Sequence, residues 1–157
     1  YEDLINFNGY VNVHLSSDNL GTLIAQGDIG QNALTDEKVE YILNSVSNPA
    51  ISGTATFVKR VNGTALVTIQ LEGTTAGGDH PAHIHDNSAA ETGGIAIDLS
   101  NVNGATGYSA TQVVEKRDGT PITYDELIVY DGYINVHLSP DDLGTLIAQG
   151  DIGANVQ

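Results

Sequence analysis

Residues 53–73 read GTATFVKRVNGTALVTIQLEG, and this stretch decides the fold class. On both sides of Asn62-Gly63 the apolar and polar side chains alternate, which is the period of a strand with one buried face. An Asn-Gly pair favours the tight turn that joins two antiparallel strands. The stretch therefore predicts a β-hairpin.

Short strand-like runs of the same kind continue along the chain, separated by turn residues. Thr123 stands three residues before Glu126, which predicts a short capped helix at about 120–132. The other expected strands are 40–46, 93–102, 107–116, 133–139 and 144–153. Because the helices of a parallel α/β fold are missing from this pattern, we predict an all-β fold, an antiparallel Greek-key β-sandwich with one short helix.

The composition agrees with a β-rich domain and excludes several classes of partner. Twenty acidic residues against five basic ones give a formal net charge of −15. Binding to nucleic acid or to an anionic membrane surface requires the opposite charge, so neither is expected. No apolar run reaches the roughly 20 residues that span a bilayer, which argues against membrane insertion. The sequence contains no cysteine, so disulfides cannot stabilise the fold.

The chain contains an internal repeat. Residues 1–32 align without a gap to residues 124–155, and 23 of the 32 positions are identical. We interpret 33–157 as one complete domain and 1–32 as the C-terminal part of a preceding unit of the same kind. A lone hairpin cannot bury an apolar face, so we expect it to pack on its own unit or to fill a gap in a neighbouring molecule. Self-association into a tandem or polymeric array is the predicted consequence.

The segment HPAHIHD at 80–86 holds three of the five histidines. In a strand, His83 and His85 point to the same side, at a spacing from which both imidazoles reach one ion. His80 precedes a proline, which favours an extended or turned backbone and a path back towards that ion. Asp79 and Asp86 flank the segment as alternative oxygen ligands or as acceptors for a histidine N–H.

A second source of imidazole is the strand at 133–139. Its alternation places Ile134 and Val136 on the core side and His137 on the other side. His14 occupies the equivalent position in residues 1–32. Imidazoles without thiolate or thioether favour Cu(II), with Zn(II) as the alternative. We therefore predict a metal site formed by His80, His83, His85 and His137, with His14 as the repeated counterpart of His137.

Structural explanations compete with this interpretation. A single exposed histidine usually makes one ordinary hydrogen bond, and the 80–86 segment could be a hydrogen-bonded polar loop. Several acidic side chains offer loop oxygens to calcium, but their spacing matches no EF-hand, and solvated turn residues explain them better. These residues are Asp18, Asp28, Asp141, Asp142 and Asp151.

Three segments within residues 40–153 are similar to the CHRD domain family, named after chordin and frequent in secreted bacterial and archaeal proteins. They are SGTATFVKRVNGTALVTIQLEG, PAHIHD and YINVHLSPDDLGTLIAQGDI. The chain departs from the family pattern where Asp86-Asn87 replaces His-Gly and where Ala-Gln-Gly-Asp replaces an arginine-bearing Ile-Arg-Gly. The resemblance implies a secreted β-sandwich in which His83, His85 and His137 come together.

These observations predict a non-enzymatic, extracellular or cell-surface module that binds copper and forms part of an array or filament. A purely structural or adhesive repeat without a functional metal is the first alternative. A copper enzyme similar in architecture to superoxide dismutase is the second, and the strongly negative charge argues against it because an anionic substrate would be repelled. No catalytic residue is predicted.

Overall fold

The computed structural model describes residues 1–156, and within them the fold is all-β with two four-residue helices. The helices are α1 (Glu2–Ile5) and α2 (Tyr124–Leu127). The strands are β1 (Asn8–Ser16), β2 (Asn19–Gly30), β3 (Leu34–Ser45), β4 (Ser52–Arg60), β5 (Ala65–Glu72), β6 (Asp79–Asp86), β7 (Ile95–Asn103), β8 (Tyr108–Val113), β9 (Asp131–Ser139) and β10 (Asp142–Gly153). Within this range, no helix is long and apolar enough to cross a membrane.

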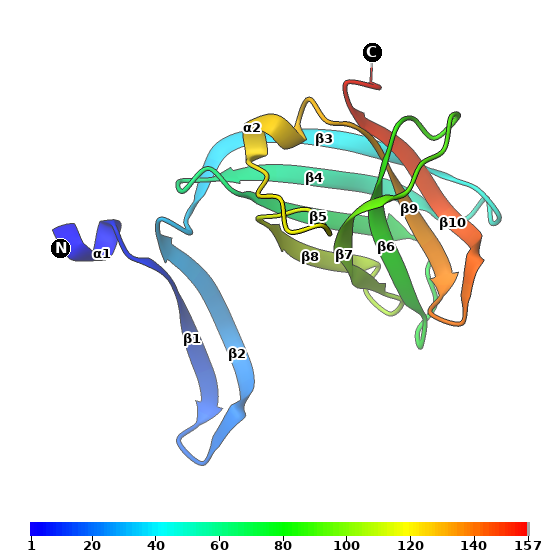
Figure 1. The fold of residues 1–157 in the computed structure, drawn as a ribbon. Helices are drawn as coiled ribbons and strands as arrows, with labels where there is room; N and C mark the ends of the chain where they lie inside the picture. The colour runs from blue at the N-terminus through cyan, green and yellow to red at the C-terminus, as the bar shows by residue number, and fades with distance from the viewer. Residues whose placement is uncertain (157) are drawn as a thin grey trace.

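Eight of the strands form a closed antiparallel barrel in the order β10-β3-β4-β5-β8-β7-β6-β9 (Figure 1). Strands β6, β7 and β8 are neighbours in sequence and in space, and β9 returns beside β6 after a long connection. This order is a Greek key. Strands β1 and β2 form a separate two-stranded sheet that projects from the barrel in Figure 1.

The all-β antiparallel prediction is confirmed, but one closed barrel replaces the predicted pair of sandwiched sheets. The closure depends on two short ladders. Strand β7 pairs with β8 at Asn103–Tyr108, and β10 pairs with β3 around Gln149–Asn44. Closure gives partners to N–H and C=O groups that would stay unpaired at the edges of two open sheets.

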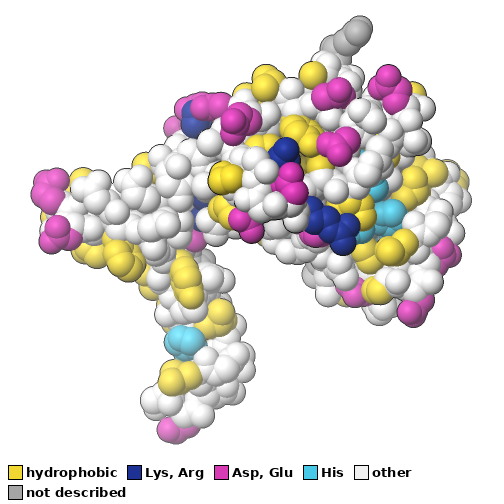
Figure 2. All heavy atoms as spheres, in the orientation of Figure 1, with side chains coloured by type: hydrophobic (Ala, Val, Ile, Leu, Met, Phe, Trp, Pro, Cys, Tyr) yellow, Lys and Arg dark blue, Asp and Glu magenta, His cyan; other side chains and the backbone are white. Residues whose placement is uncertain are grey.

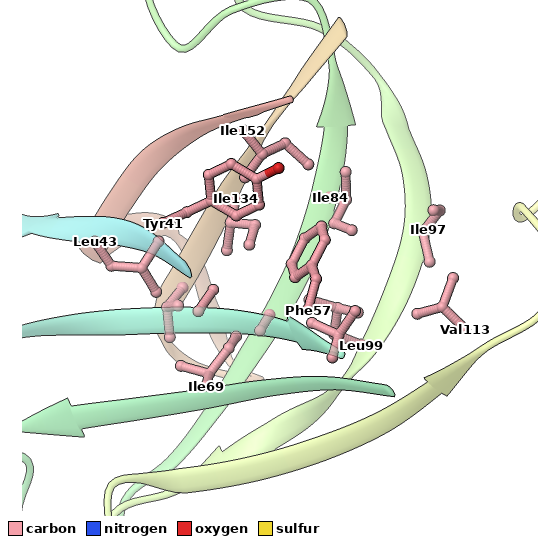
Figure 3. Close-up of a cluster of buried hydrophobic side chains, with 14 of the residues drawn as sticks. Tyr41, Leu43, Phe57, Ile69, Ile84, Ile97, Leu99, Val113, Ile134 and Ile152 are labelled. Atoms are coloured by element: carbon pink, nitrogen blue, oxygen red, sulfur yellow. The ribbon is translucent and has the colours of Figure 1, made fainter. Parts of the chain in front are cut away.

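The barrel interior is filled by the inward side chains of nearly every strand (Figure 3). Phe57 of β4 is fully buried and meets Tyr41 of β3 edge to face, with ring centroids 5.0 Å apart and an interplanar angle of 71°. Ile84 of β6 and Ile134 of β9 are also fully buried and face each other across one ladder. The alternation read from the sequence therefore places the core correctly.

Two local predictions are confirmed. Strands β4 and β5 form the hairpin expected around Asn62-Gly63, and Gly63 has φ +82°, a value that favours glycine. The expected capped helix is present as α2, although it is shorter than the predicted range. Its capping box is complete, since Thr123 accepts from the Glu126 backbone N–H and Glu126 accepts in return from the Thr123 backbone N–H.

The β1–β2 hairpin (residues 8–30) is a structural copy of the β9–β10 hairpin (residues 131–153). Every β-ladder pair of the first hairpin recurs 123 residues later in the second, from Asn8–Gly30 and Asp131–Gly153 to the pair at the hairpin tip. The two copies differ in their surroundings. The β9–β10 copy is part of the barrel, whereas the β1–β2 copy pairs with no barrel strand within residues 1–156.

Ile24 and Ile147 are equivalent residues that test this difference. Ile147 is 1% exposed in the barrel, and Ile24 is 60% exposed on the free hairpin. We expect Ile147→Ala to lower the free energy of unfolding by about 2–5 kcal/mol because it leaves a cavity in the core. Ile24→Ala should change it by less than about 0.5 kcal/mol.

Urea unfolding at low protein concentration measures both values, and an unchanged slope with denaturant shows that the two variants unfold in the same way. An equal loss of unfolding free energy in the two variants would contradict the structure, because it would mean that Ile24 of the β1–β2 hairpin is buried in solution.

Candidate metal centre

Three histidines from two neighbouring strands converge at the outer side of the barrel. His83 and His85 belong to β6, and His137 belongs to β9. Nitrogen atoms of the three rings all lie within 4.8 Å of one another. Figure 2 shows histidine side chains at the barrel surface, next to a group of Lys and Arg side chains.

The strand pleat explains this convergence. Ala82 and Ile84 of β6 are fully buried in the core, so their neighbours His83 and His85 must face outwards. On β9, Val136 is fully buried, which turns His137 to the same outer side. The β6–β9 ladder then holds the two strands side by side.

Two of the rings are oriented by backbone carbonyl groups. His85 Nδ1 donates to the carbonyl oxygen of Gly93 at 3.0 Å, and His137 Nδ1 donates to that of Leu143 at 2.7 Å. A neutral imidazole that donates through Nδ1 keeps a bare lone pair on Nε2. His85 Nε2 is buried and has no hydrogen-bond partner, which is an unusual state for a polar atom. A bound cation would satisfy it.

The third ring completes the set. His83 Nδ1 lies 3.2 Å from His137 Nε2, and His83 Nε2 lies 3.8 Å from Asp98 Oδ1. Two nitrogen ligands on one tetrahedral zinc ion are about 3.3 Å apart, given Zn–N bonds of about 2.0–2.1 Å. The contact is a hydrogen bond in the tautomer in which His83 Nδ1 carries the proton and donates to His137 Nε2. The tautomer with the proton on Nε2, facing Asp98, frees both lone pairs for an ion.

Other side chains fix the surroundings of the three rings. The Tyr133 ring stacks on His85, with centroids 5.0 Å apart and an interplanar angle of 21°. The Tyr133 hydroxyl accepts a hydrogen bond from the Gly93 N–H at 3.1 Å, which ties down the loop whose carbonyl orients His85. Arg117 Nε lies 3.5 Å from Asp98 Oδ2, so a cationic group stands behind the carboxylate that faces His83.

The site disfavours charged imidazoles. Burial is the main cause that lowers the pKa of His83, and repulsion from His137 lowers it further, although Asp98 acts in the opposite direction. Burial also lowers the pKa of His137, against the hydrogen bond to Leu143. Neutral imidazole is the form that binds a metal ion, so the site favours the form that can act as a ligand.

The remaining predicted histidines lie elsewhere. His80 is buried on β6, and its Nδ1 donates to the Leu138 carbonyl at 2.8 Å. In β6, His80 is an even number of residues away from Ala82 and Ile84, so it shares their side of the strand. It therefore does not belong to the group formed by the three converging rings. His14 lies on β1, in the separate hairpin sheet.

The predicted oxygen ligands have other contacts. Asp86 accepts a hydrogen bond from the Tyr130 hydroxyl at 2.5 Å, and Asp79 accepts one from the Asn101 side chain at 2.9 Å. Three of the five acidic residues considered for calcium also have protein partners. Asp142 accepts from Thr145, Asp151 from the Ala89 N–H and Asp28 from Arg60.

Sequence reasoning missed the residues that orient the rings. Tyr133 could have been found, because it shares the outer face of β9 with His137. Asp98 lies on β7, and Gly93 and Leu143 contribute backbone carbonyls. No local sequence pattern predicts that these groups contact the three histidines. These contacts can be identified only once the strand order, with β6 between β7 and β9, is known.

Comparison with known proteins adds no assignment to this geometry: no family model matches the chain, and no curated protein matches it with significant similarity. The site therefore rests on its own residues. Three imidazoles with oriented rings can hold one divalent transition-metal ion and leave a fourth position for another ligand.

The lowered pKa values predict how metal-free stability depends on pH. The unfolded histidines take up protons near their ordinary pKa of 6.5, whereas folded His83 and His137 resist protonation. Their contribution is therefore fully present above pH 6.5 and is lost as the pH falls through the lowered folded values. Urea unfolding in a chelator, between about pH 8 and about pH 5, measures this loss.

The control is the double variant His83→Gln/His137→Gln, in which these two groups no longer titrate. Its stability should fall less steeply over the same range. If both proteins gave parallel curves, the two histidines would not be held neutral by the fold.

Proposed function

We propose that this protein is an extracellular metal-binding module whose barrel holds one Cu(II) or Zn(II) ion through His83, His85 and His137. One observation carries the proposal. Two of the three rings donate through their outer nitrogen to a backbone carbonyl, and the third faces a carboxylate, while the inner nitrogens converge. This outer support is the usual arrangement around histidines that bind a metal.

The donor set supports copper as the first choice and zinc as the alternative. It contains imidazole nitrogen without thiolate or thioether, which disfavours Cu(I). Where nitrogen ligands and geometry are equal, Cu(II) binds more tightly than Zn(II). The net charge of −15 also attracts cations to the protein surface.

We further propose that the module works outside the cell or at its surface, as one subunit of an array or filament. The resemblance to the CHRD family and the repeated hairpin support this proposal. A strongly acidic surface keeps such a subunit soluble and is common in proteins of salty or extracellular media. The rival is a structural or adhesive repeat in which the histidines only make hydrogen bonds.

The enzymatic alternative has one observation in its favour. Arg117 contacts Asp98, the carboxylate that faces His83, so it brings a positive charge near the site that would attract an anion. The overall negative charge opposes the approach of such an anion. We therefore propose a binding role, and a superoxide dismutation assay on the copper-loaded protein tests the choice.

Metal titration tests the proposed function directly. In dilute solution, we expect the protein to bind one equivalent of Cu(II) or Zn(II) in a calorimeter and His137→Ala to lose this binding. At free metal about 100-fold above the dissociation constant, the metal should raise the free energy of unfolding by about 2.7 kcal/mol, and a chelator should reverse the gain.

His14→Ala is the matched control, because His14 has the same sequence context as His137 but lies on the free hairpin. It should bind metal like the wild-type protein. If chelator and metal left the stability of the wild-type protein unchanged, the structural repeat would be the better explanation.

Asp98 has a separate test. Asp98→Asn removes the carboxylate that supports the Nε2-protonated tautomer of His83. We expect the metal affinity to fall by about 10-fold or more, with the ligand number unchanged, because partners of the metal ligands typically have effects of this size. Competition with a chromophoric chelator measures the affinity. A variant that binds as tightly as the wild type would exclude this role.

A further inference from the structure

We propose that the β1–β2 hairpin fills the place of β9–β10 in the barrel of a second copy of this chain and supplies His14 as the third histidine of that copy's metal centre. The acceptor is a barrel in which this place is vacant. The part about His14 rests on the proposed metal site, whereas the docking of the hairpin does not.

The first argument is the identity of the two hairpins. They share their register, including the irregularities between Val13 and His14 in one and at the equivalent place in the other. A hairpin with the same register presents the same side chains to the same sides. Val13 and Ile24 thus have the positions of Val136 and Ile147, which pack in the barrel core.

The second argument is the unpartnered apolar face. Val13 is 46% exposed, whereas its equivalent Val136 is fully buried. The same contrast holds for Val11 and Ile134. Hydrophobic patches remain visible along the hairpin in Figure 2. A contiguous apolar face of this kind marks a surface that another protein covers.

The third argument shows why the acceptor must be another molecule. The β10–β3 register, continued along both strands, places Gly153 level with Glu40. Gly30 would take the position of Gly153, but it lies only four residues before Leu34 in the sequence. Four residues span at most about 14 Å. Leu34 lies six residues from Glu40 along β3, a distance of about 20 Å. The hairpin therefore cannot enter its own barrel without unravelling the start of β3.

Contacts at the hairpin base are compatible with exchange. Asp28 forms an ion pair with Arg60 at 2.9 Å, and its equivalent Asp151 accepts from the Ala89 N–H at 2.7 Å. In a second copy, Asp28 would take over the contact with that copy's Ala89. His14 Nδ1 is buried without a hydrogen-bond partner, whereas the equivalent atom, His137 Nδ1, donates to the Leu143 carbonyl. Docking would bring His14 to the position of His137, next to the second copy's His83.

Full-length variants test the docking in a chelating buffer. The acceptor is Ile24→Asp/Ile147→Asp, in which neither hairpin can bury its apolar face. The donor is the wild-type chain, whose β1–β2 hairpin is free. Refolded together at equal concentrations, they should form a heterodimer with twice the 16.4 kDa mass of one chain, measured by light scattering on a sizing column.

The matched control donor is Ile24→Asp, which keeps its own barrel but has a charge on the free hairpin. It should form no heterodimer with the same acceptor. The proposal is overturned if the two donors behave alike, whether both capture the acceptor, neither does, or the acceptor precipitates equally with both.

A second arm tests the shared site. With Zn(II) added to the heterodimer, we expect an ion in both barrels, and with a His14→Ala donor an ion in the donor's own barrel alone. Equal zinc content with both donors would exclude His14 as a ligand. If wild-type protein alone bound no metal, the proposed function would fail, while heterodimer formation in chelator would still decide the docking.

Discussion

The pairing of β6 with β9 is the constraint on which the rest of the structure depends. These strands are separated by about fifty residues of chain, and their ladder joins Ile84 to Ile134 and His83 to Asn135. On the inner side it brings fully buried side chains together in the core. On the outer side it brings the two histidines of one strand next to the histidine of the other. One register therefore sets both the packing and the candidate metal centre.

The outer side of this ladder is unusual because it is polar and yet largely buried. The outward-facing side chains of β9 are only slightly exposed: Tyr133 is 3% exposed, Asn135 7% and His137 6%. Buried polar groups need partners, and two of them are backbone carbonyls: the Gly93 carbonyl accepts from His85, and the Leu143 carbonyl, at the start of β10, accepts from His137. The inner nitrogen of His85 is left without a hydrogen-bond partner, a state that a hydrogen-bonded polar loop does not explain and that a bound metal ion would satisfy.

The repeated hairpin connects the site to assembly. A barrel of this type is complete only with a hairpin that closes it and contributes the third histidine. The chain carries two such hairpins and one barrel, so one apolar face stays uncovered in any single molecule. Where the β9–β10 place of a second copy is vacant, docking of β1–β2 would bury this face and complete that copy's metal centre in the same step.

Much of this protein was determined by local sequence. The alternation of apolar and polar residues predicted the strands and the core side of Ile134 and Val136. Asn62-Gly63 predicted a hairpin, and Thr123 with Glu126 predicted the helix cap. Each of these features depends on neighbours within a few residues. The same alternation placed His83, His85 and His137 on outer faces. Only the tertiary structure decided that the sheets close into a barrel and that His80 and His14 lie apart from the three converging rings. It also decided that Asp98 and two backbone carbonyls orient those rings. Those outcomes depend on which strands lie side by side, and strand order is set by packing of the whole chain rather than by any local pattern.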